Sequence, residues 1–173
     1  SSRGLRLGAT VACQAAVAAT SARPVSVILV EPVCEGSAYL DGLALATVQL
    51  LEASMSIKDP AWRRGLRQAP QQWQQEAVGF GMGPELHSQL LALTPSGWTM
   101  PEGVRLDLIV PTPAARSQVL AWFDSRRHTA LSVIAQPYEF DWPAEEALNS
   151  ALVPHGLLAQ LVNLCETVMD RDA

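Results

Sequence analysis

The apolar positions near the start of the chain predict a helix followed by a buried strand. Residues 9–20 are small and apolar on nearly every side, and alanine is the strongest helix former, so we expect a buried helix there. Residues 25–30 form a β-branched, almost continuous apolar run, which is typical of a strand covered on both faces. A helix and a buried strand in this order form half of a parallel β-α-β unit.

The remaining pattern predicts a helical middle section between two further stretches of alternating strands and helices. Helices are expected at 38–57, 60–78 and 85–93, a glycine-punctuated break at 79–84, strands at 104–110 and 131–135, a helix at 113–127, an aromatic loop at 137–142, and terminal helical segments at 144–150 and 155–169. This order indicates a single α/β domain with a parallel sheet. Its segments are 1–35, a helical cap-like insertion at 36–103, and a C-terminal β-α-β-α segment at 104–173.

Only three strands are expected, and no strand is predicted before the glycine-containing turn at the front. A doubly wound sheet normally has a strand at that place. The chain therefore resembles the back half of a larger α/β domain, with the N-terminal half absent.

Composition and charge narrow the class of protein. The chain has 173 residues, of which 49% are hydrophobic and 17% charged, which suits one globular domain and excludes disorder. Its net charge of −5 argues against a nucleic-acid partner. No apolar run is long enough to span a membrane, and the first residues do not resemble a signal peptide. Three widely spaced cysteines favour reduced thiols and a cytoplasmic location.

The front of the chain carries a motif that bears on chemistry. Residues 4–8 read Gly-Leu-Arg-Leu-Gly, at the place where a strand would lead into the predicted helix. The pattern G-x-S-x-G at such a turn is a nucleophile elbow, in which flanking glycines allow a tight turn and the central residue is raised above the sheet. Here the central residue is Arg6.

Several stretches together resemble the α/β-hydrolase superfamily, in particular the exosortase-A-system-associated hydrolases. They are GLRLGA at 4–9, ILVEPV at 28–33, GSAYL at 36–40, EAVGF and PEL within 76–86, and PYEFDW and EE within 137–146. The resemblance implies a sheet of α/β-hydrolase type with a helical cap. It also implies a bacterial cytoplasmic protein linked to exopolysaccharide and protein-sorting functions, with the early strands and an oxyanion-hole loop missing from this chain.

The three roles of a Ser-Asp-His triad are not filled by the residues at the expected places. An arginine stays cationic and cannot attack a carbonyl, so Arg6 is no nucleophile. The acid position after strand 104–110 offers Pro-Thr-Pro, and Asp107 lies inside the strand. His155 lies well downstream of the last strand. Arg6 could hold an anionic group at the helix N-terminus, or it could be a structural residue paired with a buried carboxylate.

Other candidate residues have both a functional and a structural interpretation. Cys34 follows the first strand and could be a nucleophile if a base such as His155 or His87 lay nearby, although a small residue filling space is the commoner role. Leu7, Tyr138 and Trp142 are candidates to line a ligand pocket. His87, His128 and His155 have no metal-ligand spacing, so neither a metal nor a cofactor is expected. Residues 62–67 form one local basic patch, which could contact an acidic partner or a sugar acid, or could simply be solvated.

Three functions follow as hypotheses. The first is a triad-less hydrolase-like protein that binds a small-molecule or saccharide-linked ligand, or a partner, in an exopolysaccharide or exosortase pathway. The second is an active ester or thioester hydrolase whose nucleophile is Cys34 or lies in a missing N-terminal half. The third is a structural subunit, as a homo-oligomer or with a complementary N-terminal fragment, because half a sheet leaves an open edge. A weaker fourth idea is that Ser1 is an N-terminal nucleophile.

Overall fold

The fold is described from a computed structural model of residues 1–173. The structure describes residues 2–21, 24, 26–54, 59–73, 76–94, 102–122, 131–137 and 154–169. The chain forms two compact units, one made of residues 1–34 and 95–173 and the other of residues 35–94.

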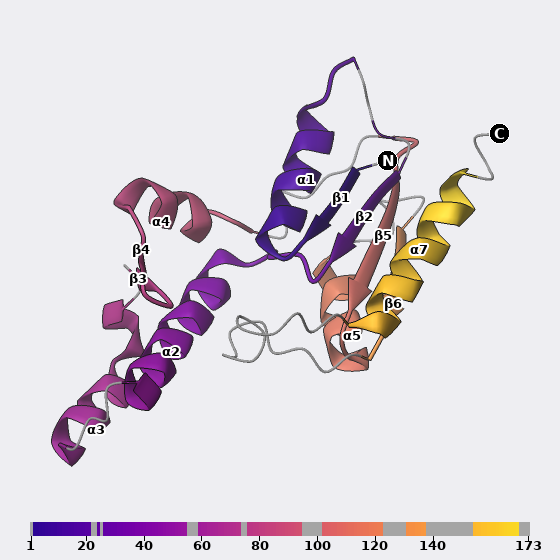
Figure 1. The fold of residues 1–173 in the computed structure, drawn as a ribbon. Helices are drawn as coiled ribbons and strands as arrows, with labels where there is room; N and C mark the ends of the chain where they lie inside the picture. The colour runs from indigo at the N-terminus through magenta and orange to yellow at the C-terminus, as the bar shows by residue number, and fades with distance from the viewer. Residues whose placement is uncertain are drawn as a thin grey trace. The chain divides into compact units, whose positions relative to one another are not determined.

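The first unit is built on a four-stranded parallel sheet with the order β1-β2-β5-β6 (Figure 1). The strands are β1 (Ser2–Leu5), β2 (Ser26–Val30), β5 (Arg105–Val110) and β6 (Leu131–Ala135). All three strand pairs are parallel, which confirms the predicted α/β class.

The expectation that no strand precedes the first helix is wrong. β1 pairs with β2 in the register Ser2↔Val27 to Leu5↔Val30. Its four residues include two polar side chains and a glycine, so they carry no apolar pattern of their own. These residues form a strand because they pair with the apolar β2. This is a tertiary effect, and local propensity does not predict it.

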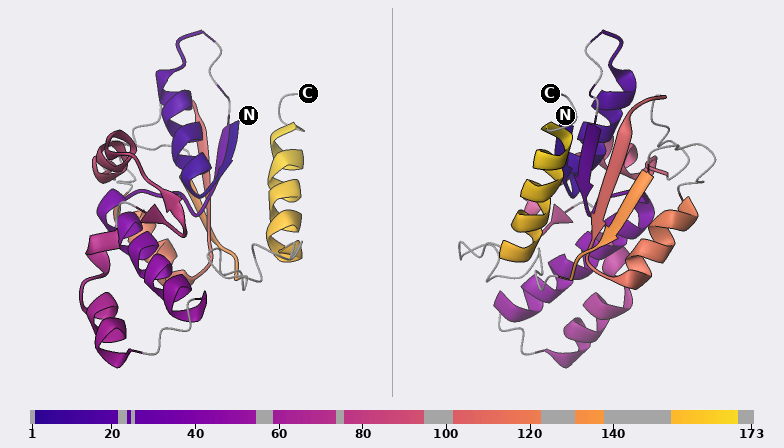
Figure 2. Two further views of the ribbon diagram at one scale, coloured as in Figure 1. Left: turned by 60° about the vertical axis from the view of Figure 1, so that its left-hand side comes forward. Right: turned by 90° about the vertical axis from the view of Figure 1, so that its right-hand side faces the viewer.

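Helices cover both faces of this sheet (Figure 2). On one face α1 (Leu7–Ala18) and α5 (Pro113–Trp122) pack on strand residues such as Leu29 and Leu108. On the other face α7 (His155–Met169) packs through Leu157 and Leu164 on Ile28, Val30 and Ile109. Every residue of β2 is buried, which explains why its sequence is a continuous rather than an alternating apolar run.

The second unit contains α2 (Gly36–Ser54), α3 (Pro60–Gln68), a 3-10 turn (Pro70–Trp73), the hairpin β3 (Glu76–Ala77) and β4 (Phe80–Gly81), and α4 (Pro84–Leu91). The helix expected over 60–78 is therefore too long. Pro70 lacks a backbone N–H, and the residue before a proline is disfavoured in helical conformation, so α3 ends at Gln68.

Some expectations fall outside the described residues. They are the helical segment at 144–150, most of the aromatic loop at 137–142, and the end of the helix predicted over 113–127. Among the described residues, no helix is long and apolar enough to cross a membrane.

One buried charge is held inside the sheet. Asp107 in β5 is completely buried, and both its carboxylate oxygens accept hydrogen bonds from Arg105, at 2.8 Å from Nε and 2.9 Å from Nη2. The side chains of residues two apart in a strand lie on the same face, so the strand itself brings this pair together. The carboxylate expected to lie inside the strand thus has a structural partner.

We predict that D107A lowers the free energy of unfolding by about 3 kcal/mol, because the Arg105 guanidinium would lose its carboxylate at a partly buried position. The double variant R105M/D107L should lie within about 1 kcal/mol of wild type, because an apolar pair needs no compensating charge. Urea denaturation measures both. The exposed Glu102 provides a control, since E102A should change stability by no more than about 0.5 kcal/mol.

Candidate functional site

The turn between β1 and α1 has the strained main chain of an elbow. Arg6 has φ 53° and ψ −125° and is the residue that joins the strand to the helix. Its N–H donates to the Val30 carbonyl at 2.8 Å, and its own carbonyl accepts from the N–H groups of Ala9 and Thr10. A positive φ is uncommon for a residue with a long side chain and persists only where the surroundings impose it.

The two glycines of the motif have different roles. A Cβ on Gly4 would lie 2.4 Å from the Ala9 Cα and 2.5 Å from the Gly8 carbonyl oxygen, so a side chain there would collide with main chain. A Cβ on Gly8 would have no atom within 4 Å. The expectation that both flanking glycines make room for the turn is therefore correct for Gly4 only.

Glu31 is the residue that faces Arg6 across the edge of the sheet. Because Leu5 pairs with Val30, the residues that follow them, Arg6 and Glu31, lie next to each other at the carboxyl ends of β1 and β2. Arg6 Nη1 lies 3.5 Å from Glu31 Oε2. Glu31 also has a positive φ of 44°, and its N–H donates to the Ile109 carbonyl at 2.9 Å. Two strained residues of opposite charge thus meet at the edge where ligands bind in open α/β sheets.

Exposure distinguishes the two partners of this ion pair. The Arg6 side chain is 38% exposed and the Glu31 side chain 15%. The pairing of Arg6 with a largely buried carboxylate, one of the two roles considered for this arginine, is present in the structure. Sequence reasoning did not single out Glu31. The sequence feature that could have indicated Glu31 is a carboxylate directly after a buried strand, at the same edge of the sheet as the elbow.

Cys34 is not suited to a nucleophilic role in this structure. Its side chain is buried, and its thiol donates to the Pro32 carbonyl at 3.6 Å. Burial, with a smaller contribution from nearby Cys13, raises the pKa of Cys34 to about 12. The reactive form of a cysteine is the thiolate, so near neutral pH only a minute fraction of Cys34 could attack. Its surroundings support the space-filling role.

The remaining candidates are not brought together into a catalytic group. His155 is exposed at the start of α7, and no hydrogen bond among the described residues links it to Arg6 or Cys34. At the acid position, the Thr112 hydroxyl accepts from the Ala115 N–H and so caps α5. Leu7 is half-buried at the first position of α1. Tyr138 and Trp142 lie outside the described residues.

The described residues show no candidate metal centre, and comparison of the whole chain with known proteins identifies no family. The described residues contain no group of three or more histidine, cysteine, aspartate or glutamate side chains that could hold a metal ion. Comparison of the chain with protein-family models and with curated proteins gave no match. The site is therefore interpreted from its own geometry.

The glycines of the elbow give a matched pair of variants. We predict that G4A destabilises the fold by about 3 kcal/mol or more, because its Cβ would meet main-chain atoms that cannot move independently. G8A should leave stability unchanged or raise it by up to about 1 kcal/mol, because alanine is the better helix former and space is available. Thermal and urea denaturation measure both. Equal effects of the two substitutions would contradict this account of the turn.

The thiols give a test of Cys34 within one sample. We predict that iodoacetamide alkylates Cys34 at pH 8 at least roughly a hundredfold more slowly in the folded chain than in urea, because the raised pKa depletes the thiolate and burial blocks access. Peptide mass spectrometry gives the rate for each cysteine. The half-buried Cys165 is the internal comparison. Labelling of folded Cys34 as fast as in urea would show that the thiol is reactive after all.

Proposed function

We propose that this chain is a hydrolase-like protein without a Ser-Asp-His triad, and that it binds an anionic group of a ligand or partner at its elbow through Arg6. The observation that carries the proposal is the main chain of Arg6. Its φ of 53° and ψ of −125°, between a parallel strand and a helix, raise the central residue of the turn above the sheet edge. A guanidinium occupies the place of a nucleophile.

The electrostatics of the elbow favour a negative ligand. A guanidinium group carries a positive charge and five donors that match the oxygens of a carboxylate or phosphate. Arg6 also precedes α1, whose first turn contains no acidic residue and whose N-terminus has no side-chain cap. The positive end of the helix and the guanidinium therefore act in the same direction.

Glu31 is proposed to hold Arg6 in place while no ligand is bound. The ion pair joins one nitrogen and one oxygen at 3.5 Å, which is longer than a bidentate arginine–carboxylate contact. A partly exposed pair of this kind is worth only about 0–1 kcal/mol. A ligand carboxylate or phosphate that approaches Arg6 would compete with this single long contact.

The class of ligand is proposed from the sequence. The motifs that resemble those of exosortase-A-system-associated hydrolases support a small-molecule or saccharide-linked ligand and a place in a bacterial exopolysaccharide or exosortase pathway. The elbow geometry supports the anionic character of the group that is bound.

Variants of the ion pair separate anion binding from a purely structural role. We predict that titration with inorganic phosphate or succinate shifts the Leu7 and Gly8 amide signals in ¹H–¹⁵N spectra, and that R6Q removes these shifts. E31Q should tighten binding by up to about fivefold, because it removes a competing carboxylate worth at most about 1 kcal/mol. R6K should retain weaker binding, since lysine keeps the charge and loses the fork.

A purely structural role of the Arg6–Glu31 pair predicts a different result. If Arg6 and Glu31 only stabilise the turn, R6Q and E31Q will lower the melting temperature by similar amounts, and neither anion will shift the two amides. Turnover of p-nitrophenyl esters by the wild-type chain that R6Q abolishes would contradict the proposal in another way, by giving Arg6 a role in catalysis.

A further inference from the structure

Polar side chains follow the four strands of the sheet at its carboxyl edge. Arg6 follows β1, Glu31 follows β2, Thr112 lies two residues after β5, and Gln136 follows β6. The strand order β1-β2-β5-β6 arranges these four residues, the edge row, as cation, carboxylate, hydroxyl and carboxamide. Adjacent strands lie about 4.8 Å apart, so the edge row extends over about 14 Å.

The main chain fixes three members of the edge row. Arg6, Glu31 and Gln136 each donate their backbone N–H to a carbonyl of the neighbouring strand, at 2.8, 2.9 and 2.9 Å. The hydrogen-bond ladder of the sheet thus continues for one residue past the end of each of these strands. Groups that are held in place before a ligand arrives lose less entropy when it binds.

The Gln136 side chain has polar atoms that the described part of the chain does not use. It is half-buried, and its Nε2 would lie 3.5 Å from a Cβ added to Gly156, so the carboxamide lies against the first turn of α7. No hydrogen bond joins this carboxamide to another described residue. A carboxamide both donates and accepts hydrogen bonds, so Gln136 can do both toward a ligand.

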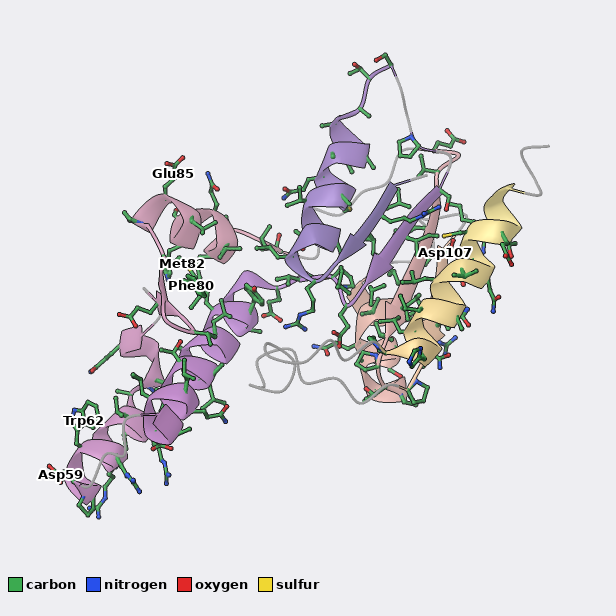
Figure 3. The ribbon with its side chains drawn as sticks, in the orientation of Figure 1. Asp59, Trp62, Phe80, Met82, Glu85 and Asp107 are labelled. Atoms are coloured by element: carbon green, nitrogen blue, oxygen red, sulfur yellow. The ribbon has the colours of Figure 1, made fainter. Side chains whose placement is uncertain are left out.

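The other neutral member of the edge row also keeps hydrogen-bonding capacity. The exposed Thr112 hydroxyl accepts from the Ala115 N–H at 3.1 Å, which leaves its own hydrogen for donation. Asp107, labelled in Figure 3, is different, because it lies inside β5, is completely buried and is already bound by Arg105. It therefore does not belong to the edge row.

The charges of the edge row restrict the ligand. Arg6 and Glu31 have opposite charges and lie 3.5 Å apart, whereas the two side chains beyond them are neutral. One anionic group can pair with Arg6, but a second one further along the row would meet the Glu31 carboxylate and be repelled. Hydroxyl groups donate to carboxylate and carboxamide oxygens and accept from N–H and O–H groups. The best ligand therefore has one anionic group followed by a neutral part rich in hydroxyls.

We propose that the edge row binds an acidic oligosaccharide, with the carboxylate of a uronic acid on Arg6 and the hydroxyls of neutral sugars on Glu31, Thr112 and Gln136. This inference rests on the function proposed above, since it begins with the anionic contact of Arg6 and names the class of ligand. A row of about 14 Å is longer than one sugar ring, so at least two sugars are needed. Glu31, which loses Arg6 to the ligand carboxylate, accepts from the adjacent sugar hydroxyl.

The test compares aldotriouronic acid, in which glucuronic acid is linked to xylobiose, with glucuronate and xylobiose alone. Binding to the 173-residue chain is measured from ¹H–¹⁵N shifts of the Leu7 and Gly8 main-chain amides and the Gln136 side-chain amide. We expect aldotriouronic acid to shift all three signals. It should bind about tenfold or more tightly than glucuronate, because it adds at least two hydrogen bonds. Xylobiose should bind more weakly than aldotriouronic acid and leave the Leu7 and Gly8 signals unshifted.

Two glutamine variants test the position of the neutral contacts. Q136A should weaken the binding of aldotriouronic acid by about fivefold, as expected for one lost hydrogen bond, and leave glucuronate binding unchanged. Gln118, which is exposed on α5, provides the matched control, and Q118A should change neither affinity. R6Q should remove the binding of both acids. Thermal unfolding of each variant verifies that it is folded.

The outcomes separate this inference from the function on which it rests. Glucuronate may be bound through Arg6 while aldotriouronic acid binds no more tightly, or while Q136A and Q118A behave alike. Either result would overturn the oligosaccharide and leave anion binding at the elbow in place. Binding of both acids that R6Q does not weaken would overturn both proposals. Equal affinity for xylobiose and aldotriouronic acid would overturn the acidic character of the ligand.

Discussion

The parallel pairing of β2 with β5 is the constraint on which the first unit depends. These two strands lie at the centre of the sheet, and their apolar side chains supply both clusters of the core. The helices α1 and α5 cover one face and α7 covers the other. Because the strands run parallel, their carboxyl ends come to one edge, and the chain must turn there after β1, β2, β5 and β6. The elbow and Glu31 lie at that edge as a direct result of the strand pairing.

The central strands could be predicted from the sequence because strands that are buried on both faces consist mainly of apolar residues. β2 is a continuous apolar run, and β5 is also apolar except at Arg105 and Asp107. β1 could not be predicted in this way, since its residues become a strand only through their partner. The helix expected over 60–78 shows a related limit, because glutamine-rich sequence does not reveal that the chain after Gln68 forms a 3-10 turn and a short hairpin.

Only part of the candidate site could be found from motif position. The motif located Arg6, because glycine spacing at a strand-to-helix junction reports a tight turn. Glu31 was missed, since its importance comes from register: it faces Arg6 only because Leu5 pairs with Val30. Cys34 shows a different limit of motif position. Its position after a strand suggests reactivity, whereas reactivity depends on burial and neighbouring charge, which a linear pattern does not contain.

The position of β1 has a consequence for the stability of the elbow. Among the described residues β1 pairs with β2 alone, whereas β2 and β5 each have a strand on both sides. Folded proteins open locally where backbone hydrogen bonds and packing are fewest, and such openings require less free energy than global unfolding. Detachment of the end of β1 would break the hydrogen bond from Arg6 to Val30 and release the strained backbone, while the central ladder stayed closed. The outer strand that positions Arg6 therefore also allows the conformation of Arg6 to relax on its own.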